Sequence, residues 1–443
     1  MENRHFHHAL RISEELCYGC SHCMNVCPTE AIRIRNGKAL LYENRCVDCG
    51  KCFMACPVKA IYIDQDDFSR LEAFKYRIAL VPSIFTGQFP EAISREQVYE
   101  AILASGFTHI YEVELGTGLL LDAIKGYAQQ HPGKKPLISS FCPAVIRLIQ
   151  VKFPALVGNI MLLKPPLDIT ALYCRKQLTD QGINPAEVGV FYFTPCAAKI
   201  AAIKSPVGED YSMITGVINM DFIYNKVKLQ IMKDRNTESI TTNPPLSGLA
   251  ERWTLTHGEA DHVEGRSLAI DEIHNVMEFL ERLENEEITD VDFLELRACD
   301  ESCAGGVLVT TNRFLVTERL NNEAALSATK EGQLGGIEEY YPYLRRRISI
   351  QEIKPRSMMK LDENMGEAMI KMDKARKIMQ ILPLTDCGAC GAPNCQAFSN
   401  DIVQGQASIK QCIFVQKSRE RTGELSSEES LSILKEIWGE EKF

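Results

Sequence analysis

Cysteine is the residue type whose number and spacing point most directly to chemistry in this sequence. The 443-residue chain has 17 cysteines, and most of them lie in short, regularly spaced groups. Thiolates bind soft metal ions, and cysteines in a large chain that is kept reduced stay free of disulfides. Closely spaced cysteines of this kind are metal ligands first and redox switches second. The grouped cysteines are therefore predicted to hold metal centres.

The first eight cysteines form two runs of identical spacing, and each run is followed by a proline. The runs begin 29 residues apart and consist of Cys17, Cys20, Cys23 and Cys27, then Cys46, Cys49, Cys52 and Cys56. Bacterial ferredoxins hold two 4Fe–4S clusters with this spacing, and the fourth cysteine of each run binds the other cluster. We therefore assign Cys56 to the cluster of the first run and Cys27 to that of the second. A zinc site is the alternative, but two complete runs favour iron–sulfur clusters.

The last four cysteines form a third group with a different spacing, namely Cys387, Cys390, Cys395 and Cys412. A glycine follows each of the first two, and glycine lets backbone amides approach the sulfides of a cluster. The segment resembles the small 4Fe–4S domain of corrinoid iron–sulfur proteins and of electron-transport-complex subunits. The resemblance implies a third accessory 4Fe–4S cluster, with a structural zinc knuckle as the alternative.

Four of the remaining cysteines lie where apolar, strand-like runs end. Cys142 and Cys196 each follow such a run, and Cys299 and Cys303 follow a third run and precede a pair of glycines. Residues at the carboxyl ends of parallel strands can converge at one edge of a sheet, where four thiolates could hold one more cluster. The fifth, Cys174, lies inside a helix-like stretch and is predicted to be a small buried hydrophobic residue.

These three cysteine loops resemble those of the catalytic domain of FeFe-hydrogenases, over residues from about 77 to about 350. The active centre of that family, the H-cluster, is a 4Fe–4S cubane joined through one cysteine to a di-iron unit that carries CO, cyanide and an azadithiolate. The resemblance implies that Cys142, Cys196, Cys299 and Cys303 hold this centre, with Cys303 at the bridging position. Lys199 matches the lysine that hydrogen-bonds a cyanide, and the resemblance places Thr194 and Ala198 at the same cofactor site.

The chain departs at several positions from the pattern of the fast catalytic members, and Asp300-Glu301-Ser302 stands where the family has Pro-Gly-Gly. Phe141 occupies the place of a cysteine that passes protons to the azadithiolate, and a phenyl ring neither donates nor accepts a proton. Thr194 and Arg297 each replace a methionine two residues before a ligand cysteine. These departures predict slow turnover, because the proton path is broken or rerouted. They resemble the sensory or otherwise divergent branches of the family.

Positive charge and replacement proton carriers are the remaining expectations for the site. Arg297 and Lys199 are expected to favour the reduced, more negative states of the centre; alternatively, Arg297 pairs with Glu295 or Asp300 in a solvated loop. A rerouted proton path needs carboxylates or histidines near the centre. The candidates are Glu259, His257, Glu295 and Glu301, each of which could instead be a surface charge.

The elements that must position these residues alternate along the chain from residue 77. Apolar runs lie at 78–84, 109–113, 137–141, 188–194 and 293–298, and helix-like stretches lie at 95–104, 119–130 and 271–283. This alternation predicts an α/β catalytic domain at 76–355, with two lobes of mainly parallel sheets around the H-cluster, and a loop at 243–248. A small α+β ferredoxin domain is expected at 1–75 and a small helical 4Fe–4S domain at 356–417. A charged tail at 418–443 ends in a helix whose apolar stripe is expected to dock on the chain, or else on a partner.

Composition limits the partners of the chain. Hydrophobic residues make up 45% and charged residues 24%, which is an ordinary globular balance, and the net charge of −10 argues against a nucleic-acid partner. There is no apolar stretch of the ~18 residues that a membrane span needs, and the N-terminus lacks the pattern of a signal peptide, so we expect a cytoplasmic protein. The family resemblance implies H2 and protons, a ferredoxin-like electron carrier or redox signalling partner, and maturation proteins that deliver the di-iron unit.

The sequence therefore leads to two hypotheses of function. The first is an anaerobic FeFe-hydrogenase-like protein that binds H2 at an H-cluster and slowly interconverts H2 with protons and electrons, as an enzyme or as an H2 or redox sensor. The second is an iron–sulfur electron-transfer or assembly protein that keeps the hydrogenase scaffold without the di-iron unit. Infrared bands of CO and cyanide distinguish the two.

Overall fold

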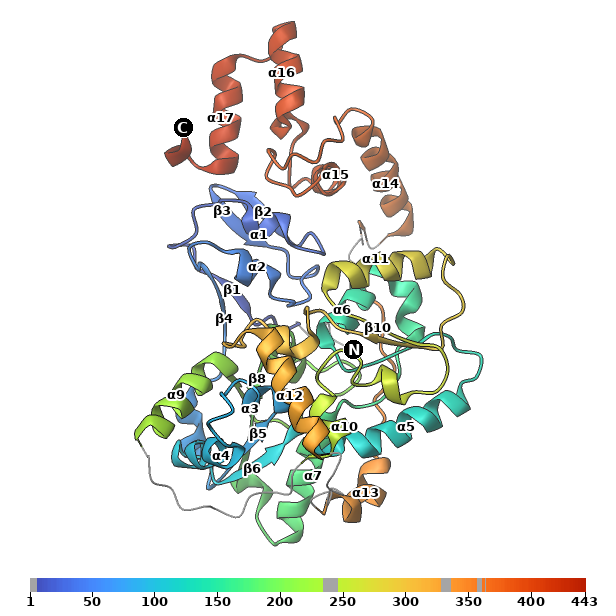
Figure 1. Cartoon of the computed structure of the whole chain (residues 1–443). Helices are drawn as coiled ribbons and strands as arrows, with labels where there is room; N and C mark the ends of the chain where they lie inside the picture. The colour runs from blue at the N-terminus through green and yellow to red at the C-terminus, as the bar shows by residue number, and fades with distance from the viewer. Residues whose placement is uncertain (1–5, 234–245, 328–335, 357–360, 363) are drawn as a thin grey trace. The chain divides into compact units, whose positions relative to one another are not determined.

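The computed structural model describes residues 6–233, 246–327, 336–356, 361–362 and 364–443. The chain separates into two compact units, each described by itself below (Figure 1). Unit 1 consists of Asp64–Pro355 with the N-terminal residues up to Ala9, and unit 2 consists of Leu10–Ile63 with Arg356–Phe443. The ferredoxin-like segment and the C-terminal cysteine segment, which are far apart in sequence, therefore share one unit.

Unit 1 contains two parallel sheets, as the alternation of the sequence predicts. The larger sheet has the order β6-β5-β8-β9 and is formed by β5 (Tyr76–Val81), β6 (His109–Glu112), β8 (Val188–Thr194) and β9 (Gly216–Asn219). The smaller sheet has the order β10-β11-β7 and is formed by β7 (Leu137–Ile138), β10 (Ser267–Ile270) and β11 (Phe293–Leu296). The mainly parallel α/β architecture of this part of the chain is therefore confirmed.

Most helices of unit 1 lie between these strands in the sequence, and the last two follow β11. The helices are α3 (Ser83–Thr86), α4 (Arg95–Ala104), α5 (Thr117–Gln130), α6 (Pro143–Lys152), α7 (Pro166–Asp180), α8 (Ala197–Lys204), α9 (Met220–Lys233), α10 (Gly248–Arg252), α11 (Ile273–Glu284), α12 (Arg313–Ser327) and α13 (Tyr341–Arg345). The predicted bounds of α4 are confirmed, because Ser94 forms a capping box with Gln97 at its start. Most of the loop predicted at 243–248 lies outside the described residues, and Gly248 begins α10.

Several strands end before their apolar runs do, and the shortening is largest at β7. The run at 137–141 predicts five residues, whereas β7 ends at Ile138. The next two residues are serines whose hydroxyl groups bond outside the sheet: Ser139 Oγ donates to the Glu259 carboxylate and Ser140 Oγ donates to the Leu163 carbonyl. These side-chain bonds turn the chain out of the sheet just before Cys142.

Unit 2 combines a small ferredoxin-like fold with a helical segment. Its antiparallel pairs are β1 (Leu10–Ile12) with β4 (Ile61–Ile63) and β2 (Ile32–Arg35) with β3 (Lys38–Leu41), and its short helices are α1 (His22–Asn25) and α2 (Lys51–Ala55). The helical segment contains α14 (Met365–Met379), α15 (Cys395–Val403), α16 (Ile413–Thr422) and α17 (Ser427–Trp438). Among the described helices of the whole chain, none is both long and apolar enough to cross a bilayer.

A buried ion pair joins the two segments of unit 2. Arg33 on β2 donates to both carboxylate oxygens of Asp401 on α15, at 2.6 and 3.0 Å, and Arg35 adds a third bond at 3.0 Å. The side chains of Arg33 and Asp401 are 0% and 1% exposed. The Ile34 amide donates to the Gly391 carbonyl, and a Cβ on Gly391 would lie 2.3 Å from the Ile34 oxygen, so only glycine fits there.

The terminal helix docks on the same strand pair. The turn after β2 donates two backbone hydrogen bonds to α17, from the Asn36 amide to the Glu436 carbonyl and from the Gly37 amide to the Ile437 carbonyl. Ile437 is buried, and Trp438 donates its indole N–H to the Ala389 carbonyl. The prediction that this helix docks on its own chain is confirmed for its C-terminal end, whereas Leu431 near its start is exposed.

Replacing Asp401 tests how the two segments of unit 2 are held together. In an Asp401→Asn variant, two buried arginines lose their anionic partner, at a cost of about 3 kcal/mol. We expect the amides of Ile34 and Gly37, which bond the C-terminal segment, to exchange with solvent deuterium roughly 100-fold faster. Hydrogen–deuterium exchange with mass spectrometry measures this directly.

Asp373→Asn is the matched control, because Asp373 pairs with Arg376 on the same C-terminal segment at 3.8 Å and both side chains are about 70% exposed. It should leave the exchange of Ile34 and Gly37 unchanged. Equal exchange in the Asp401 variant and this control would contradict the importance of the buried pair.

Candidate metal centres and active site

The eight N-terminal cysteines are brought together in the two sets assigned from the sequence. Burial and the neighbouring thiols of Cys17, Cys20 and Cys56 raise the pKa of Cys23 to about 12. Burial also raises the pKa of the thiols of the other set, and Cys27 adds to the shift at each of Cys46, Cys49 and Cys52. The fourth cysteine of each run therefore lies with the other run. Buried thiols this close cannot all ionise unless a cation compensates them, so the residues fit two metal centres.

Backbone amides are already directed at several of these sulfurs. The amides of Ala31, Ala39 and Ala60 donate to the sulfurs of Cys27, Cys17 and Cys56 at 3.2, 3.3 and 3.2 Å. Such N–H···S bonds stabilise negative charge on sulfur and raise the reduction potential of an iron–sulfur cluster. Both sets therefore carry hydrogen bonds that suit iron–sulfur clusters.

The C-terminal cysteines surround one small cavity of unit 2. It is lined by all four of them, Cys387, Cys390, Cys395 and Cys412. Burial, together with Cys412 and Cys387, raises the pKa of Cys390 to about 12. Cys387 is exposed and the other three are buried, so a metal centre held here would reach the surface on one side.

The four cysteines of unit 1 lie just beyond the carboxyl ends of three parallel strands. Cys142 follows β7 and caps α6, Cys196 follows β8 and caps α8, and Cys299 follows β11 and leads into a turn that carries Cys303. Helix N-termini favour anionic groups, so the positions of Cys142 and Cys196 suit thiolates.

Backbone contacts hold the second and third cysteine loops against each other. The Pro195 carbonyl of the second loop accepts a bond from the Leu308 amide of the third loop at 2.9 Å. The third loop is also held by the segment after α10, because the Cys303 amide donates to the Thr254 carbonyl at 3.1 Å. A Cβ on Gly305 would lie 1.9 Å from the Asp300 carbonyl oxygen, so the tight turn requires glycine. Thr194 accepts a hydrogen bond from the Cys196 amide and donates one to its carbonyl, which fixes the second loop.

The thiols of unit 1 influence one another strongly. Burial raises the pKa of Cys196 to about 12, with further contributions from Cys303 and Cys142. Burial and Cys142 also raise the pKa of Cys303, against the opposing effect of Lys199 and Arg297. Three of the four predicted ligands therefore meet at one place, and Cys299 lies four residues from Cys303 on the same turn. This set fits a metal centre.

The ring of Phe141 contacts two buried cations. Its ring centre is 4.6 Å from Lys199 Nζ and 3.9 Å from Arg297 Cζ, so both cations contact its π-electrons. Lys199 also donates to the Tyr192 hydroxyl at 3.3 Å, and Arg297 Nη1 is buried without a hydrogen-bond partner among the described residues. An unpartnered buried guanidinium nitrogen beside the cysteines fits an anionic group there.

Arg297 belongs to a buried ion network rather than to a solvated loop. Its Nη2 donates to Glu259 Oε1 at 2.7 Å, and its Nε lies 3.4 Å from Glu295 Oε1. Glu295 Oε2 also accepts the amides of Glu259 and Ala260 at 2.8 Å. The solvated alternative is therefore wrong: Arg297 does pair with Glu295, but inside the protein, and Asp300 pairs with Arg313 instead.

The other residues singled out from the sequence lie in several places. Ala198 is buried in α8 beside Lys199. His257 is 56% exposed and pairs with Asp261, and Glu301 accepts a bond from the Thr317 hydroxyl. Cys174 is buried in α7, as predicted, and burial raises its pKa to about 12.

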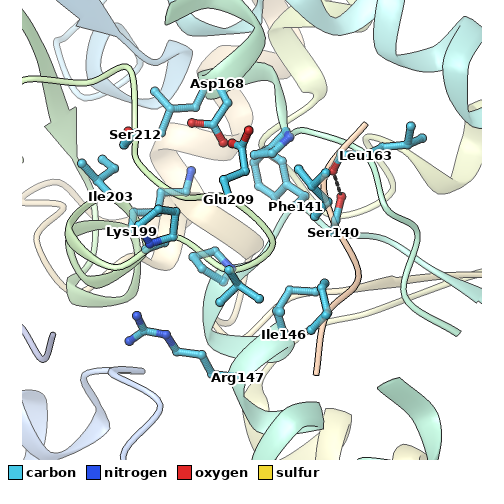
Figure 2. A pocket seen from close by; sticks show the side chains of 18 of the residues that line it. Ser140, Phe141, Ile146, Arg147, Leu163, Asp168, Lys199, Ile203, Glu209 and Ser212 are labelled. Carbon is cyan, nitrogen blue, oxygen red and sulfur yellow. Dashed lines mark hydrogen bonds between the residues drawn. The ribbon is translucent and has the colours of Figure 1, made fainter. Parts of the chain in front are cut away.

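A cavity of about 100 Å³ reaches the Phe141 and Lys199 side chains, and its wall contains carboxyl groups that no sequence motif marks (Figure 2). These are Glu114, Asp168 and Glu209. Burial raises the pKa of Glu114 to about 8, and burial raises the pKa of Asp168 to about 6 although Lys164 and Lys199 oppose that shift. None of these three carboxyl groups lies in a cysteine motif. The sequence therefore did not mark them, and the fold alone brings them together.

Replacing Glu259 separates a structural role from a proton-carrying role. In Glu259→Gln, Arg297 loses its nearest anion while buried, and we expect unit 1 to lose about 3 kcal/mol of unfolding free energy. The measurement is urea unfolding followed by the fluorescence of Trp253, with Trp438, the other of the two tryptophans, replaced by Phe in every protein compared. Glu264→Gln, at an exposed position, is the control. Unchanged stability in Glu259→Gln would show that Glu259 does not balance Arg297.

Three segments of the chain match known families. Residues 75–223 match the C-terminal domain of the iron-only hydrogenase large subunit, residues 16–61 match the 4Fe–4S dicluster domain, and residues 382–414 match a family described as a putative Fe–S cluster. These three ranges contain fourteen of the sixteen cysteines predicted to be metal ligands, among them Cys142 and Cys196. The expected iron–sulfur character of all three segments is confirmed.

Curated relatives and solved structures show more limited likeness. The chain is 53% identical over 36 residues to a subunit of the ion-translocating oxidoreductase complex of Azoarcus sp., and 50% identical over 38 residues to the corresponding protein of Thiobacillus denitrificans; it spans only 20% of the length of either relative. A solved structure that concerns stepwise assembly of the FeFe-hydrogenase H-cluster in HydA matches 66% of this chain and 96% of its own, at 15% identity and a TM-score of 0.49. The HydA1 FeFe-hydrogenase of Chlamydomonas reinhardtii, as a variant, matches the same shares at 15% identity and a TM-score of 0.47.

The family models and the cysteine geometry lead to one conclusion. Segments of the chain match the hydrogenase and iron–sulfur families in the order in which the cysteine groups occur. Residues 75–223 are therefore similar to the iron-only hydrogenase large subunit, and the cysteine segments on either side are similar to iron–sulfur cluster domains.

Proposed function

We propose that the chain binds H2 at an H-cluster held in unit 1 and slowly interconverts H2 with protons and electrons. The observation that carries this proposal is the meeting of three cysteine loops beside two buried cations, Lys199 and Arg297. A simple electron-transfer cluster needs four thiolates and no such pair of cations. Buried cations favour an anionic occupant next to the cysteines.

The residues of unit 1 have distinct tasks in this proposal. Cys142, Cys196, Cys299 and Cys303 would hold the cubane, with Cys303 shared with the di-iron unit. Bound there, the H-cluster supplies the redox chemistry that splits and forms H2. Lys199, whose pKa is raised by Cys303, Tyr192 and Cys196 against the effect of burial, stays protonated and holds positive charge beside the anionic occupant.

Phe141 and Arg297 set the speed of the site. Phe141 has no titratable proton, and its ring lies against both cations, where it takes space that water would otherwise occupy. Arg297 stays charged because Glu259 and Glu295 outweigh the effect of burial on its pKa. The cations can then stabilise reduced states while proton supply stays slow, which suits a sensor as well as a slow enzyme.

The accessory centres serve electron transfer in this proposal. In unit 2, the third cysteine group packs on the ferredoxin-like segment through Arg35, which donates to the Cys390 and Gly391 carbonyls. This contact connects the loop of one centre to the strand that follows Cys27. An exposed Cys387 makes the C-terminal centre the natural contact for a ferredoxin-like electron carrier.

A second candidate function is electron transfer or cluster assembly without the di-iron unit. The likeness of short segments to a subunit of an ion-translocating oxidoreductase favours it. In that case unit 1 would hold a fourth cubane and no more.

Infrared spectroscopy and iron analysis of protein matured under anaerobic conditions test the proposal. We expect CO and cyanide stretching bands and about 18 iron atoms per chain, from four cubanes and one di-iron unit. Replacing Cys303 by Ser should remove the bands and leave about 12 iron atoms, in the three accessory clusters. Cys174→Ser is the control, because the Cys174 thiol bonds the Ala171 carbonyl within α7 and belongs to no cysteine loop, and it should leave both measurements unchanged.

Two results would speak against the proposal. Protein with about 16 iron atoms and no CO or cyanide bands would favour the electron-transfer candidate. Protein with about 12 iron atoms, and no change on replacing Cys196 or Cys299, would show that unit 1 holds no metal centre at all.

A further inference from the structure

Two neighbouring cavities of unit 1 share a wall that contains two carboxyl groups. The inner cavity, of about 100 Å³, is lined by Phe141 and Lys199 and mainly by apolar side chains. The outer cavity, of about 360 Å³, is more open and is lined by polar residues that include Arg346 and Arg347. Asp168 and Glu209 line both cavities.

The carboxyl groups in the shared wall are linked through one lysine. Figure 2 shows the carboxylates of Asp168 and Glu209 close together in the wall of the inner cavity. Lys164, on the outer side, pairs with Glu209 and also interacts with Asp168. Asp168 lies in the first turn of α7, where it is half-buried, and Glu209 is 28% exposed. Groups that can carry a proton, namely the side chains of Lys164, Glu209 and Asp168, therefore lie between the outer cavity and the inner one.

The inner cavity contains a further polar group without a partner. Glu114 is fully buried in its wall; one carboxyl oxygen accepts the Ser83 amide at 3.0 Å, and the other has no hydrogen-bond partner among the described residues. A cavity of this size holds several waters, and water stays where several polar partners surround it. Glu114, Asp168 and Lys199 supply such partners.

We propose that Asp168 and Glu209 carry protons between the outer cavity and the inner cavity beside Lys199, in place of the route that Phe141 closes. This inference rests on the proposed function, since it supplies the protons of that reaction. During H2 oxidation, a water in the inner cavity gives a proton to the Asp168 carboxylate and regains one from the protons that the reaction releases. Asp168 passes its proton to Glu209, which gives it to water in the outer cavity. Each carboxyl group returns to its starting state, and H2 formation uses the steps in reverse.

The electrostatic surroundings of Asp168 suit a reversible proton carrier. The charged groups that act on it are Lys164 and Lys199, and burial raises its pKa to about 6. Both protonation states are therefore populated near neutral pH, which is where a general acid or base works best. Glu259 and Glu295, the carboxylates first expected to carry protons, are instead held by Arg297 and by backbone amides.

The test compares Asp168→Asn with the wild-type protein after anaerobic maturation. We expect H2/D2O isotope exchange to fall about 100-fold, with the CO and cyanide bands and the iron content unchanged. The wild-type rate should also depend on pH with an inflection near pH 6, which Asp168→Asn should abolish. Asp168→Glu keeps a carboxyl group and should restore part of the rate.

Two further variants and one measurement on unloaded protein complete the design. Asp122→Asn removes an exposed carboxylate that pairs with Arg345 and lines neither cavity, and it should match the wild type. Glu209→Gln should slow exchange as Asp168→Asn does, which covers the case in which Asp168→Asn does not fold. In protein without the di-iron unit, infrared difference spectra should show one carboxyl group titrating near pH 6 that is lost in Asp168→Asn.

The outcomes separate the relay from the proposed function. If the wild type shows CO and cyanide bands but both variants exchange within about twofold of Asp122→Asn, the relay is wrong and the proposed function stands. If the wild type shows no such bands, the proposed function fails and the relay fails with it.

Discussion

A balance of buried charge at the carboxyl ends of the parallel strands is the constraint on which unit 1 depends. Lys199 and Arg297 both lie against the Phe141 ring, where two positive charges repel each other and are cut off from water. Arg297 is compensated by Glu259 and Glu295, whereas Lys199 faces the cysteine thiols. Removing the anions that face either cation leaves a buried positive charge without compensation. The fold of the loops therefore depends on the charge of the site.

The same principle organises unit 2 with charges of a different origin. Arg33 and Arg35 come from the strand that follows the first cysteine run, and Asp401 comes from the helix that begins at Cys395. Each residue therefore lies a few positions from a predicted cluster ligand. Fixing these side chains in one buried ion pair also fixes the loops that carry the cysteines, which matters for electron transfer because its rate depends on the distance between centres.

Local sequence patterns predicted the parts of the fold that local forces determine. The strand at 188–194 and the helix at 95–104 match their predicted bounds, because a continuous apolar run and a capping box each act within a few residues. The grouping of the cysteines could also be predicted, because the spacing of ligands along the chain is set by the metal centre that they hold. The strand predicted at 137–141 was too long, because the hydroxyl bonds of Ser139 and Ser140 depend on partners far along the chain.

The long-range features could not be predicted from the sequence. Arg33 and Asp401 are 368 positions apart, and nothing near either residue indicates the other. Asp168 and Glu209 become neighbours only because the cavities form around them. For Arg297, the sequence offered Glu295 or Asp300 as partners in a solvated loop, and only the fold shows that Glu259 buries the guanidinium together with Glu295.

The central claim is that iron lies at the carboxyl ends of β7, β8 and β11. Anomalous diffraction at the iron absorption edge, from crystals of anaerobically matured protein, tests it most directly. The account predicts iron density bounded by Cys142, Cys196, Cys299 and Cys303 that continues past Cys303 toward Lys199. Iron density that ends at the four cysteines would show that the di-iron unit is absent. No iron at this position, or an anomalous signal at the zinc edge instead, would contradict the central claim.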